Sequence, residues 1–213
     1  MQPLFTIKEA LSFGWKKTVE NLWFLIILTV ATIIVSFAFD NVKGDFAPLF
    51  RILNMVVSYL AMYVAIKAGL KIFAGSKPEA KDVLDVNWSQ FGWYILGLIL
   101  SNIAIVIGFV LFIIPGIYLA VRLNMMTFTL IDQNLKPVDA FKKSLELTRG
   151  RFWKLLGFGC VIALINVLGV LAAGVGILIS IPVSLLATVY VYEKLKAAPV
   201  VVAPAPTTPV ATV

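Results

Sequence analysis

The residue types that usually carry enzymatic chemistry are scarce in this sequence. It contains no histidine, the commonest general base and transition-metal ligand in proteins. Its single cysteine, Cys160, lies in an apolar run and excludes an intrachain disulfide. Asp132 and Glu146 could act as acids at a membrane surface, but no constellation of partners accompanies them. We therefore expect no catalytic site, no metal and no cofactor.

One ionisable residue, Arg122, lies within a long apolar segment. A charged group is costly inside a bilayer and is a functional candidate there by default. The apolar segments contain no acid to pair with it, so its candidate hydrogen-bond partners are Asn102, Asn166 and backbone carbonyls. Two interpretations stay open. Either Arg122, Asn102 and Asn166 line a polar cavity that binds a ligand or anion, or Arg122 reaches outward to lipid phosphates.

The composition indicates which elements must position these residues. Hydrophobic residues make up 61% of the chain and charged residues 14%, whereas soluble domains have about 45–50% and about 25%. Such a chain has too little polar surface to cover a water-soluble globule. The 18 basic and 11 acidic residues give a net charge of +7, but these charges flank apolar runs. That pattern is typical of membrane proteins and argues against nucleic acid as a partner.

Apolar runs of about 20 residues, the length that crosses a bilayer, predict six transmembrane helices. Two uncharged runs are too long for one crossing, so each must contain a turn. We place the first turn at Pro115-Gly116 and the second at the small residues of 169–176. The predicted spans are residues 22–39, 48–73, 93–113, 117–131, 152–171 and 175–192.

The basic residues near the ends of the spans predict their orientation. Nearly all lysines and arginines fall on one side of the predicted spans, and Lys43 and Arg51 fall on the other. Because basic loops stay in the cytoplasm, both termini should be cytoplasmic, in the cytoplasmic membrane of a prokaryote. Residues 1–196 form a single integral membrane domain in this interpretation. Residues 197–213, rich in proline, alanine, valine and threonine, form a flexible cytoplasmic tail.

A short polar segment with helical spacing precedes each predicted hairpin, over residues 6–20, 76–90 and 137–149. The first and third segments align residue by residue, with Ala10 opposite Ala140 and Thr18 opposite Thr148. Capping boxes at Thr6 and Ser76 mark the starts of the first two. The predicted apolar faces consist of Ile7, Leu11, Trp15 and Thr18 in the first segment, and of Val138, Phe141, Leu145 and Thr148 in the third.

These patterns predict an all-α, polytopic membrane protein with six transmembrane helices in three hairpins. An amphipathic helix precedes each hairpin and lies along the cytoplasmic interface. Basic residues on and beside these helices would contact anionic lipid headgroups. The candidates are Lys16, Lys17, Lys142, Lys143, Arg149 and Arg151. The same surface could dock a membrane or cytoplasmic protein.

Three stretches of the sequence carry a resemblance to a known family. They are Pro115-Gly116-Ile117-Tyr118-Leu119-Ala120-Val121-Arg122, Asp132-Gln133-Asn134, and the residues from Ala140 to Gly150 followed by Phe152-Trp153. Together they resemble the membrane domain that precedes some glycerophosphodiester phosphodiesterase catalytic domains, and related six-helix prokaryotic membrane proteins that are largely uncharacterised. The resemblance implies a membrane domain without catalytic residues. The histidine and paired acids of the phosphodiesterase are absent, so its activity does not transfer.

Three functions follow as hypotheses. The first is a non-enzymatic membrane protein that organises lipid or docks partners through its basic cytoplasmic helices. The second is a small transporter or transporter subunit with a polar cavity near Arg122, because transporters often use repeats and broken helices. The third, and least favoured, is an enzyme that modifies lipids at the interface.

Overall fold

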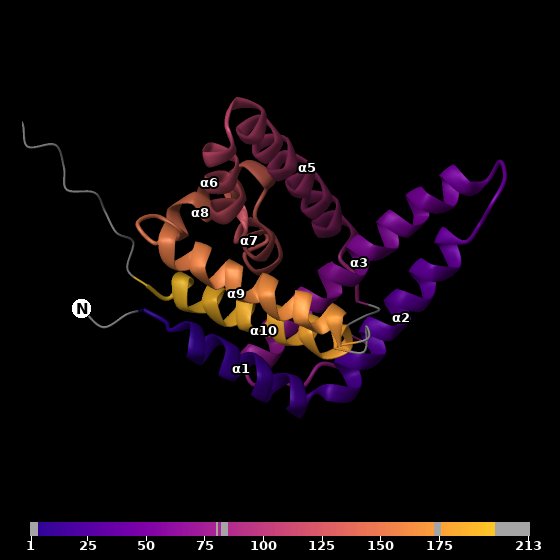
Figure 1. Cartoon of the computed structure of the whole chain (residues 1–213), viewed down its shortest axis with the longest axis horizontal. Helices are drawn as coiled ribbons and strands as arrows, with labels where there is room; N and C mark the ends of the chain where they lie inside the picture. Colours follow the sequence, from indigo (N-terminus) through magenta and orange to yellow (C-terminus); the bar gives the residue numbers. More distant parts are fainter. Residues whose placement is uncertain (1–3, 80, 82–84, 173–175, 199–213) are drawn as a thin grey trace, which may run out of the picture.

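The computed structural model describes residues 4–79, 81, 85–172 and 176–198. Within these ranges every regular element is an α-helix, and none is a strand (Figure 1). The helices are α1 (Ile7–Glu20), α2 (Leu22–Asp40), α3 (Ala47–Phe73), α5 (Trp88–Leu111), α6 (Ile113–Leu123), α7 (Met126–Asp132), α8 (Pro137–Leu147), α9 (Phe152–Leu171) and α10 (Ile177–Lys196). Residues 199–213 of the predicted tail lie outside the described residues.

Six helical segments are long and apolar enough to cross a membrane, which confirms the predicted number of spans. Five are single helices, and the fourth along the chain combines α6 and α7 over Ile113–Asp132. Large apolar side chains face outward from these segments, and Val110 and Ile114 are 82% and 80% exposed. Apolar exposure on this scale is typical of a surface covered by another apolar phase.

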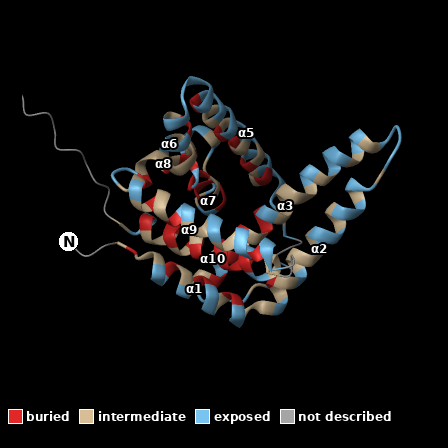
Figure 2. Ribbon diagram, viewed as in Figure 1, coloured by how far each residue is buried: buried red, intermediate tan, exposed pale blue. Residues whose placement is uncertain are grey.

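The helix α10 forms the centre of the bundle. It packs against α1, α2, α3 and α9, and buried residues follow it along most of its length (Figures 1 and 2). Elsewhere α2 packs on α3, α5 packs on α6, and α8 packs on α5, α6 and α7. Pro182 lies inside α10, where it removes one backbone N–H from the helical ladder.

The turn between the third and fourth spans lies at Phe112, and the predicted turn at Pro115-Gly116 is wrong. Phe112 is extended (φ −163°, ψ 156°), α5 ends directly before it and α6 begins directly after it. Pro115 therefore falls in the first turn of α6, where backbone N–H groups have no partner within the helix and a proline is tolerated. Gly116 does not form the turn but allows α5 and α6 to approach closely, because a Cβ at Gly108 would lie 3.0 Å from the Cα of Gly116.

A second glycine pair occupies the corresponding place between α9 and α10. A Cβ added at Gly176 would lie 2.6 Å from the carbonyl oxygen and 2.8 Å from the Cα of Gly169. In both pairs a side chain would separate two helices that approach through their backbones. Residues 173–175, part of the predicted second turn, lie outside the described residues.

The predicted helix over residues 76–90 is wrong in its bounds. Ser76 to Glu79 are not helical, and α5 begins only at Trp88. The cap of that helix is Asn87, whose Oδ1 accepts a hydrogen bond from the backbone N–H of Gln90 at 3.1 Å. Asparagine and serine are both favoured as N-caps, and Asn87 is the one that stands directly before the apolar run. Residues 80 and 82–84 of the segment lie outside the described residues.

The other two polar segments are helices, and the residues that they bury within the protein are mainly small. Thr6 and Glu9 form the predicted capping box of α1. The buried residues of α1 are Ala10, Gly14 and Thr18, and those of α8 are Ala140, Ser144 and Leu147, followed by Thr148. Of the predicted apolar faces, Thr18 and Thr148 are buried, whereas Trp15 and Val138 are each 57% exposed. Small residues bury little area, yet they allow two helices to approach closely.

Candidate functional site

The side chain of Arg122 is bound by neighbouring helices. Its Nε donates to Thr148 Oγ1 at 3.2 Å, one NH group donates to Tyr118 OH at 2.5 Å, and the other donates to the carbonyl oxygen of Leu145. The guanidinium also lies over the Tyr118 ring, 5.3 Å from its centroid. In the opposite direction, Ser144 Oγ donates to the Arg122 carbonyl at 2.7 Å. The arginine therefore fastens the end of α6 to the end of α8.

The three residues predicted to share a polar cavity are not brought together. Asn102 Nδ2 donates to the Leu98 carbonyl of its own helix at 2.7 Å. Asn166 Nδ2 donates to the Ile162 carbonyl at 3.0 Å and to Ser184 Oγ on α10 at 3.1 Å. Neither asparagine contacts the Arg122 side chain. Asn102 and Asn166 line two different cavities, and Arg122 lines neither of them.

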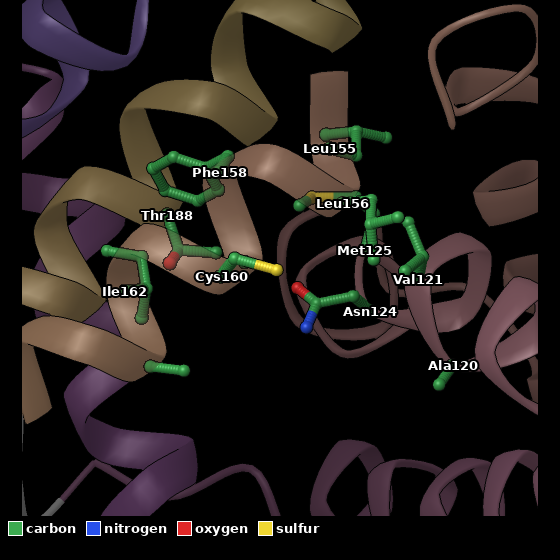
Figure 3. A pocket seen from close by; sticks show the side chains of 12 residues that line it. Ala120, Val121, Asn124, Met125, Leu155, Leu156, Phe158, Cys160, Ile162 and Thr188 are labelled. Atoms are coloured by element: carbon green, nitrogen blue, oxygen red, sulfur yellow. The ribbon is translucent and has the colours of Figure 1, made fainter. Parts of the chain in front are cut away.

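A cavity of about 320 Å³ lies between α6, α9 and α10 (Figure 3). Most of its lining is apolar, and the polar groups in it are the amide of Asn124, the hydroxyl of Thr188 and the thiol of Cys160. Figure 3 shows the Asn124 amide and the Cys160 thiol directed toward one another. Thr188 Oγ1 is already occupied, because it donates to the Ser184 carbonyl at 2.7 Å.

A neighbouring cavity of about 360 Å³ shares Asn124 and Thr188 with the first. Its further polar lining residues are Thr127, Asn166 and Ser184. No ionisable side chain other than the Cys160 thiol lines either cavity. The two cavities meet where the fourth span is interrupted between α6 and α7, at Asn124 and Met125.

Sequence reasoning missed Asn124 as a site residue. The structure places it at the interruption of a span, and its side chain is exposed there without a hydrogen-bond partner in the described part of the protein. An asparagine two residues after an arginine in an apolar segment was a weak signal at most. No proline or glycine lies at the interruption, so no local breaker residue marks it.

The end of α7 carries a second polar cluster. Asp132 Oδ2 accepts from Tyr192 OH at 2.7 Å and from Lys196 Nζ at 2.9 Å. Gln133 Nε2 donates to Tyr192 OH at 3.0 Å, and Lys196 also bonds Glu193 at 2.8 Å. Tyr192 is fully buried. The cluster fastens the end of α7 to the end of α10, and each of its groups has a partner.

A half-buried amide, that of Gln90, holds the same end of α7 from the other side. Gln90 Nε2 donates to the Ile131 carbonyl at 2.7 Å, while Gln90 Oε1 accepts from Tyr63 OH at 2.7 Å. Lys67 Nζ donates to the Asp85 carbonyl at 2.9 Å. These bonds connect α3, α5 and α7. Among the described residues, no group of three or more metal-binding side chains is present.

The six basic residues predicted to contact lipid differ in how far they are engaged within the chain. Lys17 donates to Glu20 at 2.6 Å, Lys143 pairs with Glu146 at 3.0 Å, and Arg151 donates to the Leu147 carbonyl at 3.1 Å. The hydrogen bond from Lys17 lowers the pKa of the Glu20 carboxyl below its ordinary value. The remaining candidates, Lys16, Lys142 and Arg149, are exposed and have no ionic partner among the described residues.

The chain is similar to uncharacterized proteins of Mycobacterium tuberculosis and Mycobacterium bovis. Each is 25% identical to it over 242 aligned positions, which cover 97% of this chain and 73% of the relative. No family model matches the chain, and no solved structure matches it. The similarity extends over nearly the whole chain and assigns no activity to it.

Proposed function

We propose that this chain is a non-enzymatic, multi-pass protein of a prokaryotic cytoplasmic membrane that binds and organises anionic lipid. Its six spans form three hairpins, and both termini face the cytoplasm. The helices α1 and α8 lie near the cytoplasmic interface and present basic side chains to lipid headgroups. The resemblance of residues 115–156 to a phosphodiesterase membrane domain stays a prediction, and it adds no activity.

The observation that carries this proposal is that exposed basic side chains without an ionic partner in the described part of the chain lie on the polar helices, whereas the spans expose apolar side chains. Lys16, Lys142 and Arg149 are exposed on or beside the polar helices and have no ionic partner among the described residues. The six spans, by contrast, expose mainly apolar side chains. Cations just outside the hydrocarbon core attract anionic headgroups, each by about 1 kcal/mol.

Two triple variants with equal loss of charge test the proposal. Substitution of Lys16, Lys142 and Arg149 by glutamine removes the uncommitted cations. Substitution of Lys17, Lys143 and Arg151 by glutamine removes cations that already have partners within the chain. We expect the first variant to bind phosphatidylglycerol roughly a hundredfold more weakly than the wild type, and the second to lose less than about tenfold.

The measurement is titration of detergent-solubilised protein with phosphatidylglycerol, with phosphatidylcholine as the uncharged reference. Equal losses in the two variants would show that net charge, and not these three positions, governs binding. Preference for phosphatidylglycerol that survives in the first variant would contradict the proposal. Recovery of a stoichiometric protein by wild type, but not by the first variant, would favour docking of a partner by the same residues.

A transporter or transporter subunit is the second candidate function. The interrupted fourth span, Pro182 within α10 and the two cavities that adjoin Asn124 favour it. Transporter binding sites are often built at such interruptions. The polar groups available are Asn124, Asn166 and Thr188, and Arg122 contributes none. Proteoliposomes should then accumulate an uncharged polar solute, and flux that is unchanged in Asn124→Leu would contradict a role for this cavity.

A further inference from the structure

The amide of Asn124 is a hydrogen-bonding group without a partner at the middle of a candidate membrane span. It lies in the break between α6 and α7, inside Ile113–Asp132. Neither its oxygen nor its nitrogen has a hydrogen-bond partner within the described part of the protein, and the side chain is exposed to the adjoining cavities. An amide in apolar surroundings needs both an acceptor and a donor opposite it.

The other two asparagines discussed above meet only half of this need. The amide nitrogen of Asn102 donates to Leu98 of its own helix, and that of Asn166 donates to Ile162 of its own helix, while Asn166 Oδ1 is buried without a partner among the described residues. The Asn124 amide does not make the corresponding bond to its own helix, although the backbone of Asn124 is helical (φ −54°, ψ −33°). Thr127, which lines the second cavity, also lacks a hydrogen-bond partner in the described residues.

The space in front of the Asn124 amide is large enough for a ligand. The two cavities that share Asn124 measure about 320 and 360 Å³. Ligand pockets in proteins typically measure about 300–1,000 Å³ and combine apolar walls with a few polar groups. The walls here come from the middle of four candidate spans, so the site lies at hydrocarbon depth.

The chemistry of the lining restricts the ligand. A charged headgroup would have no counter-charge, because the cavities contain no basic or carboxylate side chain. A plain hydrocarbon chain would leave the amide unpaired. A ligand with a hydroxyl donor beside a carbonyl acceptor satisfies both halves of the amide, and a long chain matches the apolar walls.

We propose that Asn124 and the two cavities around it bind a long-chain glyceride with a free hydroxyl group, such as a monoacylglycerol. The ester carbonyl accepts from Asn124 Nδ2 and the hydroxyl donates to Asn124 Oδ1, while the acyl chain lies along α9 and α10. This site goes beyond the proposed function, since its ligand is uncharged and its position is remote from Lys16, Lys142 and Arg149.

Cys160 supplies a reporter for this test. It is the chain's single cysteine, it is exposed, and it lines the first cavity beside Asn124 (Figure 3). The rate at which a small maleimide alkylates Cys160 in the purified full chain is measured by mass spectrometry. The probes are 1-oleoylglycerol, methyl oleate, which lacks the hydroxyl donors, and oleate, which is charged.

We expect 1-oleoylglycerol to slow alkylation roughly tenfold at about ten times its Kd, because only unoccupied protein reacts. Methyl oleate and oleate should protect Cys160 much less. In Asn124→Leu the preference for 1-oleoylglycerol over methyl oleate should disappear. Asn102→Leu is the matched control, since that amide is already bonded within its own helix, and it should keep the preference.

The wild-type series is decisive even if Asn124→Leu does not fold. Equal protection by 1-oleoylglycerol and methyl oleate, or no protection by either, would overturn the proposal. Protection by oleate alone would point to a cationic site instead. The phosphatidylglycerol titration tests other residues. Its outcome, including a loss of anionic-lipid binding in the triple variant, therefore neither supports nor contradicts the glyceride proposal.

Discussion

At the scale of single residues, Arg122 shows how a membrane-embedded cation can be held without an acid. Its guanidinium donates to Thr148, Tyr118 and the carbonyl of Leu145. Leu145 belongs to the last turn of α8, and the negative end of a helix dipole favours a cation there. These neutral oxygens and the dipole together replace a counter-ion. The side chain therefore holds α8 against α6, which favours a structural role for it.

Substitution of Arg122 tests this role. Arg122→Ala should destabilise the protein by roughly 2–3 kcal/mol, because it leaves buried acceptors on α8 unpaired. Arg122→Lys should recover part of the loss, since one ammonium cannot reach all three acceptors. The measurement is the midpoint of thermal unfolding in detergent. An unchanged midpoint together with lost binding of an anionic ligand would instead identify Arg122 as a ligand contact.

Tyr192 is a second residue whose hydrogen-bond partners are brought to it by the packing of the helices. Its hydroxyl donates to Asp132 and accepts from Gln133 in a fully buried position. Tyr192→Phe should lower the free energy of unfolding by about 1–2 kcal/mol, because Asp132 and Gln133 each lose a part-buried hydrogen bond. Tyr190→Phe is the matched control, since the Tyr190 ring packs at a tilt against Phe13 and its hydroxyl has no hydrogen bond in the described residues. Equal midpoints for the two variants would contradict the importance of the Asp132 cluster.

At the scale of elements, glycine pairs decide how closely neighbouring spans approach. Gly108 faces Gly116 between α5 and α6, and Gly169 faces Gly176 between α9 and α10. Without an excess hydrophobic driving force between helices in lipid, close packing through small residues supplies much of the association. Each pair lies next to the connection between its two helices, where the helices approach most closely.

Alanine scanning of α9 tests the glycine contact. A Cβ at Gly169 would lie 2.5 Å from Ser180 Oγ and 3.2 Å from the backbone of Gly176, so Gly169→Ala should destabilise the protein by about 1–3 kcal/mol. Gly157→Ala lies in the same helix, and its Cβ would meet nothing within 4 Å. It should be neutral or should stabilise by up to about 1 kcal/mol. Unfolding in detergent, followed by circular dichroism, separates them, and a Gly169→Ala variant as stable as Gly157→Ala would refute the contact.

At the scale of the whole molecule, α1 and α8 take equivalent places in two parts of the bundle. The helix α1 packs on α10, and α8 packs on α6 and α7. Ala10, Gly14 and Thr18 are buried in α1, as are Ala140, Ser144 and Thr148 at the corresponding positions of the third segment. Each polar helix is therefore held by a candidate span and not by lipid alone. This arrangement places the basic residues of both helices relative to the spans.

The proposed orientation predicts which positions are accessible from each side of the membrane. In a Cys160→Ala background, Lys43→Cys should react with an impermeant maleimide in intact cells, because the turn between α2 and α3 faces outward. Lys142→Cys should react only after the cells are opened, since α8 faces the cytoplasm. Labelling of Lys142→Cys in intact cells, or protection of Lys43→Cys, would invert the topology.

The sequence by itself determined the six spans, the helical class and the capping box at Thr6, because hydropathy, helix length and capping are local properties. It misplaced the turn at Phe112 and the start of α5, since competing local signals there differ by small energies. It did not indicate that small residues such as Ala10, Ala140 and Ser144 are the ones that α1 and α8 bury, because close packing of small residues depends on the neighbouring helices.

Only the tertiary structure decided the partners of the polar groups. Arg122 binds α8 instead of Asn102 or Asn166, and Tyr192 binds Asp132 from a distant part of the chain. Only the packing of the helices places the amide of Asn124 beside two cavities. A buried polar group in an apolar medium takes whichever partner the packing of helices brings within reach. That choice depends on residues far away in the sequence, so no local pattern can specify it.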